Sequence, residues 1–321
     1  MTIDVVIPIH GGREMTERCL ATLAEQTVEH RTIVVDNASP DDSVAVLRER
    51  FPGVEVVEMG ANRGYAAACN AGIAAGGAEV VVLLNNDVLL TPDFFEQLVA
   101  PLAGAPSVGS VTPVLTRPDG RTIDNAGLAA DPTLAGFPRL QGRPLEEAGK
   151  TGPLLLGPSG AAAAYRRAAL DAVDGLDEGI FLYQEDLDLA LRLRAAGWGT
   201  VFAVDARGVH LGSATAGRGS AWQRRHAGFA RGYLLRRYGV LRGGHAARAL
   251  VTELAVTSGD LALSRDLASL RGRLAGWRAG GRAPRRKLPS EGIDGSIGLR
   301  DSLRLRREDR VIAIEGRDPA G

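Results

Sequence analysis

The sequence has few features of a secreted or membrane-spanning protein. It contains only two cysteines in 321 residues, Cys19 and Cys69, which is too few for a disulfide framework. Both lie in helix-like segments, where we expect small buried side chains. No apolar run approaches the ~18 residues of a membrane span, and no basic region followed by an apolar one marks a secretory signal. We therefore expect a cytoplasmic protein, with a peripheral position at the inner face of the cell membrane as the alternative.

Familiar nucleotide-binding motifs are also missing. The turn after the first strand-like segment, residues 10 to 13, is neither G-x-G-x-x-G nor a Walker A loop, which argues against a dinucleotide Rossmann site and a P-loop. Lysine is scarce, since Lys150 and Lys287 are the only two in the chain. The lysine-containing activation loop expected of a nucleotidyltransferase is therefore absent. Any nucleotide must be held in another way.

The net charge of zero hides an uneven distribution. Residues 1 to 217 carry 16 basic and 28 acidic side chains, whereas residues 218 to 321 carry 22 basic and 10 acidic ones. A basic tail of this kind favours an anionic partner such as phospholipid headgroups or diphosphate ligands; the alternative is a solvated helical surface. No nucleic-acid-binding motif accompanies it, so we expect no nucleic-acid partner.

The first part of the chain alternates strand-like and helix-like segments. Strands are predicted at residues 5–9, 32–35, 54–58 and 80–84, with helical periodicity between them. This order predicts right-handed βαβ units and a Rossmann-like, mostly parallel central sheet flanked by helices. The run from Val80 to Leu84 is apolar throughout, as in a strand covered on both faces.

Polar side chains stand where these strands end. Asp36 closes the second strand, and Asn85, Asn86 and Asp87 follow the fourth. Open α/β sheets bind ligands at this carboxyl edge. A carboxylate there can hold a metal ion, and Asp36 can accept hydrogen bonds from a base or a ribose. The alternative for Asp36 is that it caps the next helix.

Later segments carry further polar groups. Small residues at 157–165 are compatible with a strand past which a bulky ligand slides. Glu185 and Asp186 begin a predicted helix, where the helix dipole favours acids whether or not they have a function. His210 follows a strand predicted at residues 200–204.

In this order, six motifs resemble those of glycosyltransferase family 2, and within it bacterial rhamnosyltransferase-like members. They are V-I-P-I-H at 6–10, V-V-D-N-A-S at 34–39, N-R-G-Y-A-A-A-C-N at 62–70, L-L-N-N-D-V at 83–88, F-L-Y-Q-E-D-L-D at 181–188 and V-H-L-G-S at 209–213. The resemblance covers roughly residues 3 to 240. It implies the GT-A fold and inverting transfer of a sugar from a nucleoside diphosphate donor to a hydroxyl group. The donor it favours is dTDP-L-rhamnose, with UDP-sugars as the alternative, and the acceptor is a glycan, a lipid-linked molecule or a natural product.

The resemblance also implies roles for individual residues. Those assigned to the donor nucleotide are Pro8, His10, Asp36, Asn62, Gly64, Asn85 and Asn86. Asp87 is the expected ligand of Mg²⁺ or Mn²⁺, with His210 as a second ligand; the alternative for His210 is a capping or packing histidine. Only Asp87 is a carboxylate in the family's Asp-x-Asp-like motif, because Asn85 stands at its first position. That departure weakens the metal site and supports an alternative function, a nucleotide-sugar-binding protein with lost or weak transferase activity.

The acceptor side follows from the same resemblance. Asp186 is the expected general base, with Glu185 beside it to orient the acceptor or tune the base. Ser159, Gly160 and Arg218 are assigned to the acceptor or the diphosphate.

The chain divides into three predicted parts. Residues 1–217 form the catalytic domain, with a donor half to about 115 and an acceptor half beyond it. Residues 218–277 form basic amphipathic helices with a break near Ser258 and Gly259, and residues 278–321 form an Arg- and Gly-rich, partly disordered linker and tail. A helical hairpin of this kind suits contact with a membrane leaflet; the alternatives are packing on the catalytic domain or on a second copy in a homodimer.

Overall fold

The structure is a computed structural model, described for residues 1–212 and 219–306. The strands of its main sheet are β1 (Ile3–Ile9), β2 (Arg31–Asp36), β3 (Glu55–Glu58), β4 (Val80–Leu84), β5 (Val88–Leu90), β6 (Val108–Thr116), β7 (Ile123–Asn125), β10 (Ala162–Arg166) and β11 (Gly199–His210). A separate hairpin joins β8 (Leu128–Ala130) and β9 (Gly136–Pro138). The helices are α1 (Arg13–Ala24), α2 (Ser43–Arg50), α3 (Tyr65–Ala75), α4 (Phe94–Ala103), α5 (Arg167–Asp171), α6 (Glu185–Ala195), α7 (Ala221–Arg237), α8 (Ala246–Ser264) and α9 (Ala268–Arg282), with 3-10 turns η1 (Leu145–Glu147) and η2 (Val240–Arg242).

The main sheet has nine strands in the order β3-β2-β1-β4-β10-β6-β11-β5, with β7 paired to β6. Strands β1 to β4 are parallel, as predicted. Beyond them the sheet is mixed, because β10 runs antiparallel to both β4 and β6. The chain re-enters the sheet at the carboxyl edge of β4, where the Asn85 amide donates to the Ala161 carbonyl, and it must then run back across the sheet. Strands β6 and β11 are parallel to each other and run in the same direction as β1 to β4, so the predicted mostly parallel sheet is confirmed.

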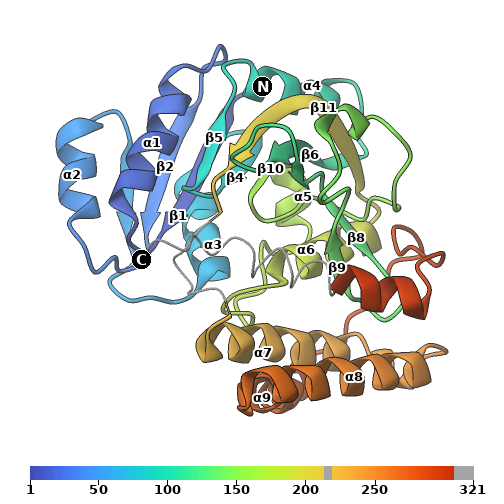
Figure 1. Ribbon diagram of the computed structural model, residues 1–321. Coiled ribbons are helices and arrows are strands. Elements are labelled where there is room, and N and C mark those ends of the chain that lie inside the picture. Colours follow the sequence, from blue (N-terminus) through green and yellow to red (C-terminus); the bar gives the residue numbers. More distant parts are fainter. Residues whose placement is uncertain (213–218, 307–321) are drawn as a thin grey trace.

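The alternation of side chains along the central strands divides the core into two layers. Val5, Ile7 and Ile9 of β1 face one layer with α1 and α4, whereas Val6 faces the other with α3, α5 and α6. Strand β4 is fully buried on both faces, as its uninterrupted apolar sequence predicts. Figure 1 shows these helices on the two sides of the sheet. Cys19 and Cys69 are buried and unpaired within these layers, as predicted.

The C-terminal helices pack on the α/β part through α7. Apolar residues of α7 share a buried cluster with α6, and α8 and α9 lie on the outer side of α7 in Figure 1. Helices α7 and α9 meet backbone to backbone at glycines. A Cβ atom added to Gly276 would lie 1.9 Å from the Phe229 carbonyl oxygen, and one added to Gly232 would lie 2.1 Å from the Arg273 carbonyl oxygen.

Two predictions for this region are wrong. Helix α8 continues through Ser258 and Gly259, and the break falls instead at Arg265, which adopts a left-handed conformation after the helix. The segment 278–287 is not a linker, because α9 extends to Arg282 and Arg286 forms ion pairs with Asp177 and Asp188. Arginine and glycine here serve helix packing and buried ion pairs. Within the described ranges, no helix combines the length and the apolar character needed to cross a bilayer.

Candidate active site

The loops after β1, β2 and β3 are joined at the carboxyl edge of the sheet. His10 Nδ1 donates to the Asn37 carbonyl (3.0 Å), and the Asn37 amide side chain donates to Asn62 Oδ1 (3.0 Å). Asp36 is buried, and its carboxylate accepts the Ser39 amide at 3.1 Å. The pairing of β1 with β4 ends at Val6, before Pro8. The missing N–H of Pro8 therefore interrupts no hydrogen bond between β1 and β4. Hydrogen bonds thus join His10, Asn37 and Asn62, while Pro8 and Asp36 lie on the adjacent strands β1 and β2.

Gly64 is required by its surroundings. Its φ is +90°, and an added Cβ would lie 2.4 Å from the Phe181 carbonyl oxygen. The same carbonyl accepts the Tyr65 amide at 2.8 Å. Close contact between these backbones therefore brings the segment before α6 against the start of α3.

Tyr65 links the fourth strand to the acceptor side. Its hydroxyl lies 3.0 Å from Asn85 Oδ1 and 2.9 Å from the Gly160 carbonyl, and the Gly160 amide donates to Asp186 Oδ2 at 2.9 Å. Asn85, Gly160 and Asp186 thus belong to one hydrogen-bonded site. Asn86 is different, because its side chain points back to α1 and donates to Thr16 Oγ1 at 2.9 Å.

Asp87 is buried, with a relative exposure of 1%. Neither of its carboxylate oxygens has a hydrogen-bond partner among the described residues. His210 Nε2 lies 3.3 Å from Oδ2, close enough for an ion pair but outside hydrogen-bond geometry. Strand pairing explains this approach, since His210 is opposite Val88 in the β11–β5 ladder.

His210 lies between two carboxylates. Its Nδ1 contacts Asp124 Oδ2 at 2.8 Å, on the side away from Asp87. Burial alone would lower the pKa of His210, but the contacts with Asp124 and Asp87 outweigh burial and raise the pKa to about 10. Burial likewise opposes ionisation of Asp124, yet its contact with His210 keeps the pKa of that carboxyl below its usual value.

From the sequence, Asp124 and Asn125 could line the acceptor cleft or lie in a surface loop, and no contact with His210 was predicted. Asn125 Nδ2 donates to Asp124 Oδ2 (3.1 Å), and Ser159 Oγ donates to Asn125 Oδ1 (2.6 Å). A continuous chain of polar contacts therefore runs from Ser159 through His210 to Asp87. The sequence offered only a polar D-N-A-G stretch in a region without periodicity, and its pairing with β6 across the sheet could not be inferred from local pattern.

Glu185 and Asp186 begin α6, as predicted. The two residues before them, Tyr183 and Gln184, have φ values of 70° and 62°, a strained conformation for residues with side chains. This turn presents both acids at the helix start. Asp186 accepts the amides of Gly160 and Leu187, whereas Glu185 Oε2 is buried without a partner in the described part of the chain.

Both acids of this pair bind protons more tightly than ordinary carboxyl groups. Burial, followed by the charge of Asp186, raises the pKa of Glu185. Burial also raises the pKa of Asp186, against the opposing effect of the backbone amides. A carboxyl pair of this kind can take up a proton near neutral pH, which is the property that general base catalysis requires.

Asp87 and His210 fit a divalent cation only as part of a coordination shell. The orphaned, buried oxygens of Asp87 are the hard donors that Mg²⁺ and Mn²⁺ prefer. Over residues 1–212 and 219–306, no group of three or more His, Cys, Asp or Glu side chains is arranged to hold a metal. A cation held by these two residues would need further ligands, such as water or the oxygens of a bound anion.

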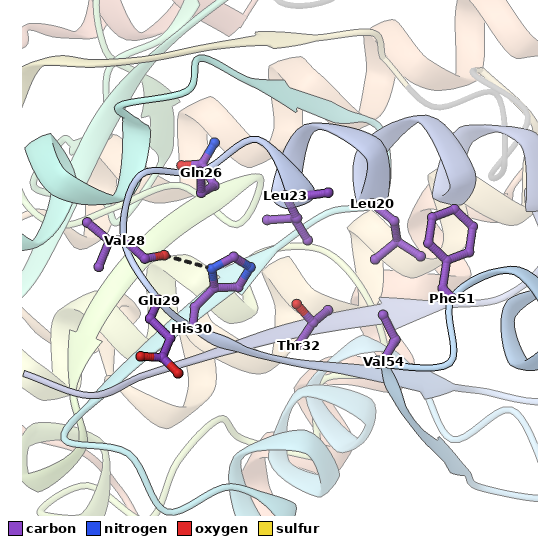
Figure 2. Close-up of a pocket in the computed structure, with 11 residues that line it drawn as sticks. Leu20, Leu23, Gln26, Val28, Glu29, His30, Thr32, Phe51 and Val54 are labelled. Carbon is purple, nitrogen blue, oxygen red and sulfur yellow. Dashed lines mark hydrogen bonds between the residues drawn. The ribbon is translucent and has the colours of Figure 1, made fainter.

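Arg218, predicted near the diphosphate, lies outside the described residues. A surface pocket of about 400 Å³ lies elsewhere, around Leu23, His30, Thr32 and Phe51 (Figure 2). Thr32 stands near the start of β2, at the end opposite Asp36, and His30 Nδ1 is occupied by the Val28 carbonyl at 3.0 Å. Since α/β sheets bind ligands at their carboxyl edge, we place the site at Asp36, Asn85 and Asp87 and not in this pocket.

Solved structures of glycosyltransferases have the same fold. A mannosyltransferase from Pyrobaculum calidifontis, solved with GDP-Man and Mn²⁺, matches 97% of this chain and 80% of its own with a TM-score of 0.52 and 19% identity. GalNAc-T7, solved with UDP, GalNAc and Mn²⁺, matches 88% of this chain and 55% of its own with a TM-score of 0.58 and 14% identity. These likenesses show that the fold is that of the GT-A glycosyltransferases.

Sequence similarity defines the family. The profile of Glycosyl transferase family 2 matches residues 4–174, and the chain belongs to this family. It is 30% identical over 248 residues to the N-acetylglucosaminyl-diphospho-decaprenol L-rhamnosyltransferase of Mycobacterium tuberculosis, covering 68% of this chain and 79% of that protein. It is also 27% identical over 224 residues to the O-antigen biosynthesis protein RfbC of Myxococcus xanthus, covering 66% of this chain and 17% of that protein. The predicted family is confirmed.

Proposed function

We propose that this glycosyltransferase moves L-rhamnose from dTDP-L-rhamnose, with inversion, to a hydroxyl of a lipid-linked glycan in cell-wall or polysaccharide biosynthesis. The name of the mycobacterial relative supports both sugar and acceptor class. The observation that carries the proposal is Asp87, a buried strand-end carboxylate whose two oxygens lack hydrogen-bond partners among the described residues and lie beside His210. Protonated His210 supplies the counter-charge of this buried carboxylate, and a bound cation would take over that role once His210 gives up its proton.

In the proposed donor site, Asp36 and the loop residues joined to it hold the nucleotide, and Asn85 faces the ribose or the sugar. Asp87 and His210 would hold Mg²⁺ or Mn²⁺, which when bound offsets the negative charge that develops on the diphosphate. His210 must release its proton to act as a ligand, and Asp124 orients its ring through Nδ1.

In the proposed acceptor site, Asp186 removes the proton from the attacking hydroxyl. The Gly160 and Leu187 amides hold the two Asp186 oxygens in place, so the carboxylate needs little reorganisation before it acts. Glu185 lies next to it and retains a proton, which avoids two adjacent buried charges. Attack from the face opposite the diphosphate inverts the anomeric carbon.

A panel of nucleotide sugars tests the donor. We expect dTDP-L-rhamnose to raise the melting temperature of the purified protein more than other dTDP- or UDP-sugars, and Mn²⁺ to increase that rise, because at equal concentration a ligand that binds more tightly stabilises the folded state more. A larger shift with a UDP-sugar would overturn the rhamnose assignment. No shift with any nucleotide sugar, with or without metal, would overturn the donor site itself.

One observation favours a second function, a nucleotide-sugar-binding protein without transfer. Asn85 replaces the first acid of the family's metal motif, and its Oδ1 is already occupied by the Tyr65 hydroxyl. The loss of one charge weakens metal binding without removing donor binding. Release of free sugar or of a glycosylated product from the donor by purified protein would exclude this function.

A further inference from the structure

Helix α8 presents an apolar stripe to solvent. Nine of its residues are exposed, and all but Leu263 recur at helical spacing and form one face: Ala247, Leu250, Val251, Leu254, Ala255, Ser258, Leu261 and Ala262. We call this the outer α8 face. Leu250, Val251 and Leu254 are 52%, 53% and 60% exposed. An apolar helix face normally covers a core, so contiguous exposure here marks an interaction surface.

The opposite side of α8 carries the charges. Glu253 is buried and accepts hydrogen bonds from Arg231 of α7 (2.7 Å) and Arg273 of α9 (3.0 Å). Arg248 pairs with Asp131 of the α/β part at 2.9 Å. These contacts fix which way α8 faces. The helix cannot roll to bury its leucines without breaking ion pairs that lie inside the protein.

More exposed leucines continue beyond this face. Leu263 is 79% exposed at the end of α8, Leu267 precedes α9, and Leu270 and Leu274 are exposed on α9. Figure 1 shows α8 and α9 together on the outer side of the helical extension. Exposed leucines therefore occur on both outer helices and in the turn between them.

The exposed charges around this surface have one sign. Between residues 238 and 290, every charged side chain classed as exposed is basic: Arg242, Arg265, Arg271, Arg278, Arg282, Arg285 and Lys287. The three acids in that range, Glu253, Asp260 and Asp266, are buried or half-buried. In a dimer formed through this surface, basic side chains of the two copies would repel each other. An anionic partner would instead meet the opposite charge at each of these exposed side chains.

We infer that the outer α8 face docks on an anionic phospholipid leaflet. Leucines would enter the boundary between headgroups and acyl chains, and the arginines would lie at the level of the lipid phosphates. None of the described helices is suited to cross the bilayer, so this contact is a peripheral one. Docking requires neither donor nor acceptor, and its test is therefore independent of the proposed transfer reaction.

Flotation with lipid vesicles tests the inference on the full chain. We expect the wild-type protein to float with vesicles of phosphatidylcholine and phosphatidylglycerol, and much less with phosphatidylcholine alone. The variant Leu250→Glu/Leu254→Glu should bind the anionic vesicles roughly tenfold or more weakly, because it places charge in the apolar boundary. The matched control is Leu154→Glu, since Leu154 is 51% exposed on the α/β part and should be dispensable for flotation.

A charge variant separates the two contributions. Arg271→Glu/Arg278→Glu should lose the preference for phosphatidylglycerol, and added salt should reproduce that loss in the wild type. If the glutamate variants melt earlier than the wild type, Leu250→Gln/Leu254→Gln should show the same weakened binding in a stable protein. Wild-type protein that stays at the bottom of the gradient with anionic vesicles would overturn the inference. So would a homodimer, measured by light scattering, that the Leu250→Glu/Leu254→Glu variant dissociates.

Discussion

The α/β part and the C-terminal helices use the same residue types in opposite places. In the α/β part, leucine, valine and isoleucine fill two layers around the sheet, and the carboxylates stand at strand ends. In the helical extension, Arg231 is 3% exposed and paired with Glu253, whereas Leu254 and Leu263 are 60% and 79% exposed. The extension therefore buries charged side chains and exposes apolar ones, whereas the α/β part that it covers buries apolar side chains.

This difference shows how each region acquires its specificity. The sheet obtains its site from topology, because parallel strands bring distant polar residues to one edge. The extension obtains its orientation from buried ion pairs and glycine contacts, which need particular partners and not merely burial. This orientation leaves the apolar outer α8 face exposed, and in our proposal that face contacts the lipid leaflet.

The largest effect we expect lies in the site of the α/β part. Asp186→Asn should lower transfer by about 10²–10⁴-fold, the range typical of a lost general base. Donor binding should stay near wild type, because Asp186 lies on the proposed acceptor side. Initial rates with a saturating donor measure the first quantity and donor-induced thermal shifts the second. Near-normal turnover in this variant would show that another group takes the proton.

Replacing the buried Arg231 of the extension should lower the stability of the protein more than replacing an exposed arginine. Arg231→Ala removes hydrogen bonds to Glu253 (2.7 Å) and to the Thr133 carbonyl (2.9 Å). We expect the free energy of unfolding to fall by about 3–5 kcal/mol, as for other broken buried pairs. The matched control is Arg31→Ala, whose pair with Glu55 is exposed and should contribute at most about 1 kcal/mol. Equal losses of stability in denaturant titrations of the two variants would contradict a stabilising role of the buried Arg231–Glu253 pair.

The carboxyl pair should make stability depend on pH. Burial and the charge of Asp186 raise the pKa of Glu185 in the folded state above its unfolded value. The stabilisation from this bound proton is therefore fully present at acidic pH below the unfolded pKa and is lost as the pH rises through the folded pKa. Each unit between the two pKa values corresponds to about 1.4 kcal/mol. Glu185→Gln should flatten this decline in urea titrations between about pH 4.5 and pH 8, and an unchanged decline would assign it to other groups.

The smallest effect we predict concerns the missing acid of the metal motif. Asn85→Asp adds a carboxylate next to Asp87 and should strengthen the dependence of transfer on Mn²⁺ by a few-fold, because a second charged oxygen increases affinity for a hard cation. Titration of activity with Mn²⁺ measures the change. An unaltered Mn²⁺ dependence would mean that Asn85 faces only the ribose.

Sequence patterns predicted the fold, and the family resemblance supplied the site residues, whose roles stay predictions. Strands β1 to β4 have apolar runs that end in polar turns, and the six motifs carry the remaining assignments by resemblance. The short strands β5 and β7 to β9 escaped prediction because three residues show no periodicity. The contact between Asp124 and His210 could not be predicted, because the two residues are 86 positions apart in the sequence.

The orientation of the helical extension also could not be predicted from the sequence. Amphipathic spacing predicts that α8 has an apolar face but cannot say whether that face turns inward. The structure settles this through Arg248, Glu253 and their partners on other elements. Arginine in segment 278–287 suggested a solvated linker, although Arg286 instead reaches Asp177 at 2.8 Å.

Asp87 provides the most direct test of the account. Thermal shifts of the wild type and of Asp87→Asn should be measured with the nucleotide sugar that binds best, each with and without Mn²⁺. We predict that Mn²⁺ increases the donor-induced shift of the wild type and leaves that of Asp87→Asn unchanged, since the variant lacks the only buried carboxylate at the end of β4. An equal Mn²⁺-dependent increase in both proteins would contradict the assignment of the metal and diphosphate to this edge of the sheet.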